Sequence, residues 1–164
     1  DGGDVRFPNG ILFGSDTADA NTLDDYEEGT ITPTLLGSSS NPTQTYDSRG
    51  GFYQKIGNRV FYTIRIEMNG SGISAGSGDL IIGGLPFTIA NDVNNYGAVT
   101  IGIPSGFGTG QHGAPTNGYH SINETLLRLQ VYDNDGGNIA GASNADAADV
   151  TNGTTITVSG NYKV

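Results

Sequence analysis

The clearest periodic pattern in the chain is Arg59-Val60-Phe61-Tyr62-Thr63-Ile64-Arg65-Ile66-Glu67-Met68. The odd-numbered positions are mostly polar, and the even-numbered ones are apolar: Val60, Tyr62, Ile64, Ile66 and Met68. A period of two is typical of a β-strand with one buried face. Ile56-Gly57-Asn58 supplies the turn residues of a tight hairpin to a second run at residues 51–55. We therefore predict an antiparallel strand pair.

Similar short runs, bounded by glycine or asparagine, recur along the chain, and helical periodicity is almost absent. They predict strands at residues 30–36, 79–83, 96–103, 118–122, 125–132 and 154–164. This spacing is typical of an all-β fold, here an antiparallel β-sandwich or jelly roll. We assign residues 30–164 to this domain and residues 1–29 to an N-terminal connector, and we interpret the alanine-rich residues 140–148 as a surface loop.

Composition excludes several classes of protein. The 164 residues suit one domain, and their formal charge of −10 opposes nucleic-acid binding, which requires clustered lysine and arginine. No run approaches the roughly 18 apolar residues that span a bilayer, so we expect a soluble domain without membrane insertion. The single methionine is Met68 and the first residues lack signal-peptide character, which indicates a piece of a larger protein. With no cysteine, stability must come from sheet packing, bound ions or oligomerisation.

Two motifs match catalytic patterns by letter only. Residues 72–76 (Gly-Ile-Ser-Ala-Gly) fit a nucleophile elbow, and residues 108–113 fit a dinucleotide-binding fingerprint. Neither is followed by a predicted helix, which both chemistries need. We expect no catalytic residue, and we expect His112 and His120 to be surface or pocket-lining residues that could contact a ligand.

Acidic residues raise the question of a metal ion. Asp133-Asn134-Asp135-Gly136 resembles the start of a calcium loop, with Asp133 and Asp135 as ligands, but the distal glutamate is missing and an Asx turn explains the same residues. The cluster at residues 24–28 is interpreted as a solvated acidic turn rather than a cation or acid–base site. We expect no cofactor, with Ca²⁺ at Asp133 and Asp135 as the alternative.

The aromatic residues suit recognition of sugars, whose C–H faces stack on flat rings while amides and carboxylates bind the hydroxyls. Several of them lie near asparagine-rich loops. With the two histidines they form our predicted ligand-binding set: Tyr96, Phe107, His112, Tyr119, His120 and Tyr132.

Several segments, in order along the chain, resemble tail fibre and tail-associated proteins of bacteriophages. The most specific is Thr22-Leu23-Asp24-Asp25-Tyr26-Glu27-Glu28-Gly29-Thr30 followed by Thr32-Pro33-Thr34-Leu35, a junction motif in which Ile31 stands where tryptophan is common. The others are residues 7–11, 51–60, 85–87, 94–96 and 157–162. The resemblance implies a C-terminal fibre-tip domain of the virion, usually trimeric, that binds a host surface glycan or protein without catalysis. Residues 1–29 would then end the fibre shaft.

The residues themselves also favour a homotrimer, because the strand at residues 59–68 offers apolar or aromatic side chains on both faces. Phe61 would then lie at an interface between copies; the alternative is a sandwich that covers both faces within one chain. We place recognition in the loops of residues 104–119 and 132–138. Two other functions stay open: a carbohydrate-binding module of a polysaccharide-degrading enzyme, and a structural trimerisation cap.

Overall fold

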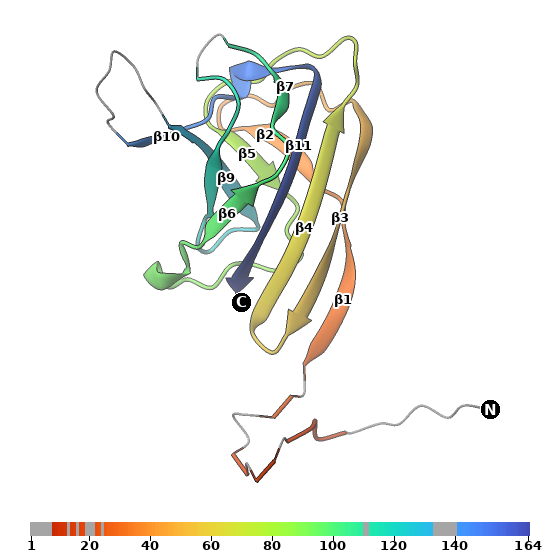
Figure 1. Ribbon diagram of the computed structural model, residues 1–164, viewed down its shortest axis with the longest axis vertical. Coiled ribbons are helices and arrows are strands. Elements are labelled where there is room, and N and C mark those ends of the chain that lie inside the picture. Colours follow the sequence, from red (N-terminus) through yellow and green to blue (C-terminus); the bar gives the residue numbers. More distant parts are fainter. Residues whose placement is uncertain are drawn as a thin grey trace, which may run out of the picture.

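The computed structural model describes residues 8–12, 14–15, 17–18, 22–23, 25–109, 112–132 and 141–164. Nearly all of its regular structure is β-strand (Figure 1). The strands are β1 (Tyr26–Ile31), β2 (Thr34–Gly37), β3 (Tyr46–Ile56), β4 (Arg59–Met68), β5 (Leu80–Gly83), β6 (Ala98–Ile101), β7 (Ser105–Phe107), β8 (Asn117–His120), β9 (Leu126–Tyr132), β10 (Ala142–Asn144) and β11 (Val150–Lys163). Two short 3₁₀ helices are η2 (Val93–Asn95) and η4 (Ala147–Asp149).

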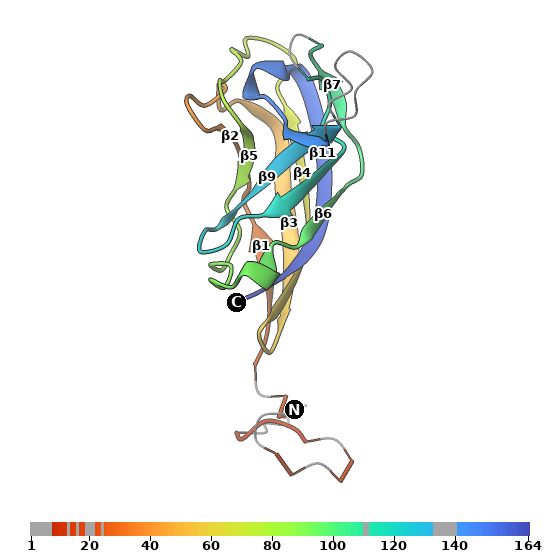
Figure 2. The same ribbon diagram turned by 90° about the vertical axis from the view of Figure 1, so that its left-hand side faces the viewer.

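The strands form one antiparallel sheet in the order β1-β3-β4-β11-β6-β8-β9-β5-β2, with β7 on β11 and β10 on β9. The sheet curls so that β9 crosses in front of β3 and β4 in Figure 2, with β5 beside them. This produces two layers, one of β1, β3, β4 and β11 and the other of β8, β9, β5 and β2, with β6 joining them. The prediction of an all-β sandwich is confirmed.

The core lies between the two layers and is built from the apolar side of the pattern at residues 59–68. Ile64 and Ile66 of β4 are fully buried and pair in register with Val158 and Ile156 of β11. Gly57 has φ 55°, the left-handed conformation that the β3–β4 turn requires. Burying each such side chain contributes about 1.5–3 kcal/mol.

Two of the predicted elements differ from the structure in their course, and β3 is longer than the run predicted at residues 51–55. The strand expected at residues 30–36 is divided at Thr32-Pro33, because β1 pairs with β3 whereas β2 crosses to the other layer and pairs with β5. Within the predicted loop at 140–148, the described residues 141–148 are not simply a surface loop: β10 pairs with β9, and the N-cap of η4 is Asp146, whose side chain accepts the Ala148 N–H at 2.8 Å. Ala145 and Ala147 are fully buried, and this packing explains why the segment forms regular structure.

The N-terminal segment joins the sandwich where β1 begins, at Tyr26, inside the segment that we interpret as a connector. Its described residues extend away from both layers, and Ile11 and Leu23 form an antiparallel bridge within it (Figure 1). The β4–β5 connection, β7 and η4 gather at the opposite end of the sandwich. The domain boundary at residue 30 stays a prediction.

The described part of the chain contains no helix of the length and apolarity needed to cross a membrane.

Candidate functional site

The structure brings together Tyr96 and Tyr119, two residues of the predicted ligand-binding set. Tyr119 points outward from β8, and Tyr96 follows η2, which is fixed by the Asp92 carboxylate accepting the Asn94 N–H at 2.9 Å. The two ring centroids are 6.0 Å apart, with the planes tilted by 52°. Tyr96 is 51% exposed. The pair forms an accessible aromatic surface on the outside of the second layer.

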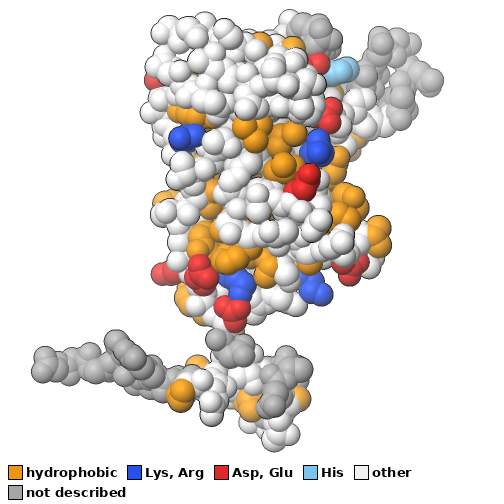
Figure 3. All heavy atoms as spheres, turned by 180° about the vertical axis from the view of Figure 1, so that it is seen from behind, with side chains coloured by type: hydrophobic (Ala, Val, Ile, Leu, Met, Phe, Trp, Pro, Cys, Tyr) orange, Lys and Arg blue, Asp and Glu red, His pale blue; other side chains and the backbone are white. Residues whose placement is uncertain are grey.

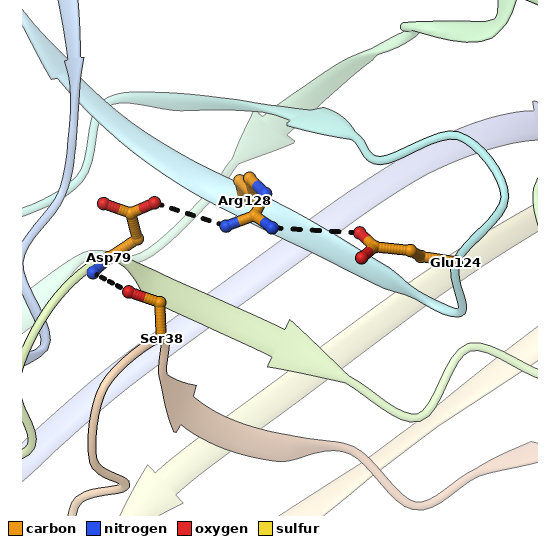
Figure 4. A network of polar contacts seen from close by, with 4 residues as sticks. All are labelled: Ser38, Asp79, Glu124 and Arg128. Carbon is orange, nitrogen blue, oxygen red and sulfur yellow. Dashed lines mark hydrogen bonds and ion pairs between the residues drawn. The ribbon is translucent and has the colours of Figure 1, made fainter.

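Arg128 of β9 lies directly across from Tyr119 in the β8–β9 register. Its guanidinium donates to Asp79 Oδ2 at 3.2 Å and lies 3.9 Å from Glu124 Oε2, while the Asp79 N–H donates to Ser38 Oγ at 2.8 Å (Figure 4). Partly exposed ion pairs of this kind contribute at most about 1 kcal/mol, so the network orients Arg128 more than it stabilises the fold. An aromatic surface therefore adjoins fixed hydrogen-bond donors and acceptors.

Sequence reasoning missed Arg128, Asp79 and Glu124. The alternation of residues 126–131 could have indicated that Arg128 lies on the outer face of its strand. Leu127 and Leu129, the residues on either side of it, are fully buried. Nothing local indicated the acidic partners, which come from the residue before β5 and from the β8–β9 turn.

Three other members of the predicted set lie apart from the tyrosine pair. Phe107 is half-buried against the core at the end of β7, whereas His112 and Tyr132 are exposed. The loop after β7 is held by Asp149, a buried residue whose carboxylate accepts the backbone N–H groups of His112 and Gly113, each at 2.8 Å. In Figure 1, β7 lies at the end opposite to the N-terminal segment, while η2 lies near the end where that segment joins. The predicted set thus divides into two groups.

His120 requires a correction, because its side chain is fully buried rather than available to a ligand. Nδ1 lies 2.8 Å from the Gly97 carbonyl, which can only accept, so Nδ1 carries the proton and Nε2 accepts from the Tyr62 hydroxyl at 2.9 Å. A Cβ added at Gly160 would lie 2.7 Å from Tyr62 Oη, so glycine permits this packing. Burial lowers the pKa of His120, and the hydrogen bond to Gly97 opposes that shift. We reassign His120 to the core.

This burial predicts an acid-sensitive stability. Because the folded pKa of His120 is lowered, its stabilising contribution is present above the unfolded pKa of about 6.5 and is lost as pH falls towards the folded value. We expect the free energy of unfolding to fall by up to about 1.4 kcal/mol per pH unit in that window. Urea titrations of the wild type and His120→Gln across it would measure this slope.

His112→Gln is the matched control, because the His112 side chain is exposed. The free energy of unfolding of His112→Gln should depend on pH as that of the wild type does, whereas His120→Gln should lose this dependence. An equal slope in wild type and His120→Gln would contradict the assignment of the buried neutral imidazole.

The acidic junction motif fastens β1 to β3. Asp25 forms an ion pair with Lys55, which is buried over the Phe87 ring, and Glu27 accepts from the Tyr53 hydroxyl. Glu28, on the other face of β1, accepts from the Tyr26 hydroxyl. Among the described residues, no group of three or more His, Cys, Asp or Glu side chains is placed to hold a metal ion. Asp24, Asp133 and Asp135 lie outside the described residues, so Ca²⁺ at the last two stays a prediction.

A second accessible feature lies on the outside of the first layer. It is a wide depression of about 890 Å³, lined by residues 28–30 of β1, 52–54 of β3, 61–63 of β4 and 159–161 of β11, with Thr100 of β6. Phe61 is 45% exposed here. Among the described residues, the outer face of its strand is therefore left uncovered, and the homotrimer stays a prediction.

Charged side chains of both signs lie in small mixed groups on the face shown in Figure 3. No broad basic patch appears among the described residues of that face.

No protein-family model and no curated protein sequence matches the chain. Among solved structures, the fold is similar to that in the crystal structure of the Dettilon tailspike protein, with a TM-score of 0.63 and 20% sequence identity. The match covers 84% of this chain and 24% of the tailspike chain, so this chain spans about a quarter of that protein's length. At this identity the likeness shows the fold alone: the curled β-sandwich described above is similar to one part of a tailspike protein.

Proposed function

We propose that the chain is a non-enzymatic host-attachment domain of a phage tail fibre or tailspike, which acts as a homotrimer on the virion and binds a glycan of the host surface. The observation that carries the proposal is the fold similarity to a tailspike protein across 84% of the chain. The resemblance of the sequence to tail fibre proteins supports it independently.

The surface of Tyr96, Tyr119 and Arg128 is the proposed glycan site. The rings offer flat apolar faces to sugar C–H groups, and the Arg128 network offers hydrogen bonds to hydroxyls. Arg128 is already neutralised by Asp79 and Glu124, and the chain carries a formal charge of −10. We therefore expect a neutral rather than an acidic polysaccharide. Weak sites of this kind gain strength when three are joined in one particle.

The absence of catalysis is part of the proposal. Ser74, in the motif that resembles a nucleophile elbow, lies in the β4–β5 connection, and its N–H donates to Thr43 Oγ1 at 3.0 Å. The residues that follow Ser74 lead into strand β5, whereas a nucleophile elbow needs a helix there, and the described chain contains no α-helix. Incubating the protein with its glycan ligand and analysing the products by mass spectrometry would detect cleavage, which would overturn this part of the proposal.

Two measurements test the function as a whole. The mass in solution at micromolar concentration should be that of a trimer, and an array of bacterial polysaccharides should contain at least one neutral ligand. A monomer that binds glycan would favour the carbohydrate-binding module. A trimer that binds none would favour the structural cap.

The site itself is tested by substitution. We expect Tyr119→Ala and Tyr96→Ala each to weaken glycan binding by roughly three- to tenfold per site, because each removes one stacking ring. Calorimetry on the ligand found by the array would measure the change.

Tyr132→Ala is the matched variant in the other group of predicted residues, because Tyr132 is also an exposed tyrosine. It should bind as the wild type does. If Tyr132→Ala loses binding and the other two variants keep it, recognition lies at the end of β9, as the sequence first indicated, and the Tyr96–Tyr119 site is wrong.

A further inference from the structure

The first layer carries a patch of large apolar side chains on its outer face, which we call the outer patch. Its members are four exposed side chains: Tyr26 (57% exposed), Phe52 (71%), Ile56 (44%) and Phe61 (45%). The β-sheet register makes them contiguous, because Tyr26 pairs with Ile56, while Phe52 and Phe61 occupy diagonal positions of the β3–β4 pair. The outer patch adjoins the depression, which Phe52 and Phe61 line.

The other large apolar side chains that the structure describes as exposed are distributed along the chain, in the N-terminal segment, in η2 and after it, after β6 and at the end of β9. Single exposed apolar residues are ordinary, but a contiguous group on a regular sheet marks a contact surface. The outer position of β9 opposite Tyr119 instead carries Arg128, which is held by acidic partners. The two layers therefore differ in what their outer faces can bind.

On the outer face of β4, Arg65 and Glu67 pair with each other at 2.9 Å. The remaining charges that flank the outer patch are separated by sign. Glu28 lies on β1, at one side of the outer patch. Arg59 and Lys163 lie opposite each other on β4 and β11, at the other side. A neighbour that presents its β1 side to the β4–β11 side of this chain would match acid to base across the contact. A second copy of this chain has that surface.

We propose that the outer patch and the depression bury against neighbouring copies of this chain, so that the first layers face one another around a three-fold axis. This inference rests on the trimer in the proposed function and names the surface that forms it. The β1 side of each copy contacts the β4–β11 side of the next, which is a head-to-tail contact that closes into a ring. The Tyr96–Tyr119 surface belongs to the other layer and stays accessible.

The test uses Phe52→Asp in the full chain, with Val93→Asp as the matched control. The two side chains are 71% and 72% exposed, so neither substitution opens the core, and Val93 lies in η2, outside the outer patch. Native mass spectrometry and analytical ultracentrifugation over a concentration series should show that Phe52→Asp raises the concentration of half-dissociation at least about 30-fold, because truncating a central aromatic anchor has an effect of this size. Val93→Asp should match the wild type.

A second readout uses the absence of cysteine from the chain. In the assembled protein, Phe52→Cys should react with a maleimide at least about tenfold more slowly than Val93→Cys, because the buried interface excludes the reagent. Circular dichroism on all four variants confirms that the sandwich is folded.

The outcomes separate the inference from the function on which it rests. A wild-type trimer that Phe52→Asp leaves intact, with rapid labelling of Phe52→Cys, overturns the surface assignment and leaves the trimer standing. A wild-type monomer overturns both. If Phe52→Asp abolishes glycan binding while the trimer mass is unchanged, the depression is a ligand site and the inference is wrong.

Discussion

Replacing Ile64 with alanine should lower the free energy of unfolding by about 2–5 kcal/mol. Ile64 is fully buried at the centre of β4, between β3 and β11, where its register partners are Gly51 and Val158. A Cβ added at Gly51 would lie 2.5 Å from the Thr63 carbonyl oxygen. The main chains of β3 and β4 are therefore already in close contact here, and they cannot move closer to fill the cavity that the alanine leaves. Urea denaturation followed by circular dichroism, at one protein concentration, would measure the loss.

Ile103→Ala is the matched control, because it removes the same atoms from a side chain that is 48% exposed. Its effect should stay within about 0.5 kcal/mol. If Ile64→Ala and Ile103→Ala were equally mild, the strand would not have the buried face that the fold requires.

The second large effect is expected in alkali. Burial raises the pKa of Tyr162 to about 12, and burial also raises the pKa of Tyr62, which contacts the same core. A tyrosine whose folded pKa is raised stabilises the fold below the unfolded pKa of about 10 and loses that contribution as pH rises towards the folded value. Tyr162 alone should remove roughly 2.7 kcal/mol of stability between pH 10 and 12, and Tyr62 should add to the loss.

Stopped-flow pH jumps would test this, with tyrosinate absorbance and circular dichroism recorded together. The buried tyrosines should ionise only as the sheet unfolds. Tyr162→Phe should flatten the stability profile in this range, and Tyr132→Phe is the control because its ring is exposed. Ionisation of every tyrosine before any loss of β-structure would contradict the buried cluster.

The buried cluster around Tyr62 shows how far sequence patterns extend. Alternation placed Tyr62 on the inner face of its strand, and the same alternation in residues 117–120, where Gly118 is also buried, contained a signal that His120 points inward. We instead predicted that His120 is a surface or pocket-lining residue that contacts a ligand. The hydroxyl of Tyr62 and the carbonyl of Gly97 make its burial tolerable, and both come from other strands or connections.

For the candidate surfaces too, the sequence predicted single residues but not which residues lie together. The aromatic content of the sequence predicted Tyr96 and Tyr119 as residues suited to sugars, and the apolar or aromatic side chains on both faces of β4 predicted Phe61 at an interface. It did not indicate that Tyr96 and Tyr119 touch, that Arg128 lies beside them, or that Tyr26, Phe52 and Ile56 extend the surface around Phe61. Those relations depend on which strands are neighbours.

By itself, the sequence determined the all-β class, the β3–β4 hairpin around Gly57 and the inward face of β4, because these follow from a local period of two and from glycine at a positive φ. Only the tertiary structure decided the strand order β1-β3-β4-β11-β6-β8-β9-β5-β2, and with it the Tyr96–Tyr119–Arg128 surface and the outer patch. The physical reason is that alternation fixes which side chains of one strand share a face. The neighbour of each strand is fixed by packing between residues that are far apart in the chain.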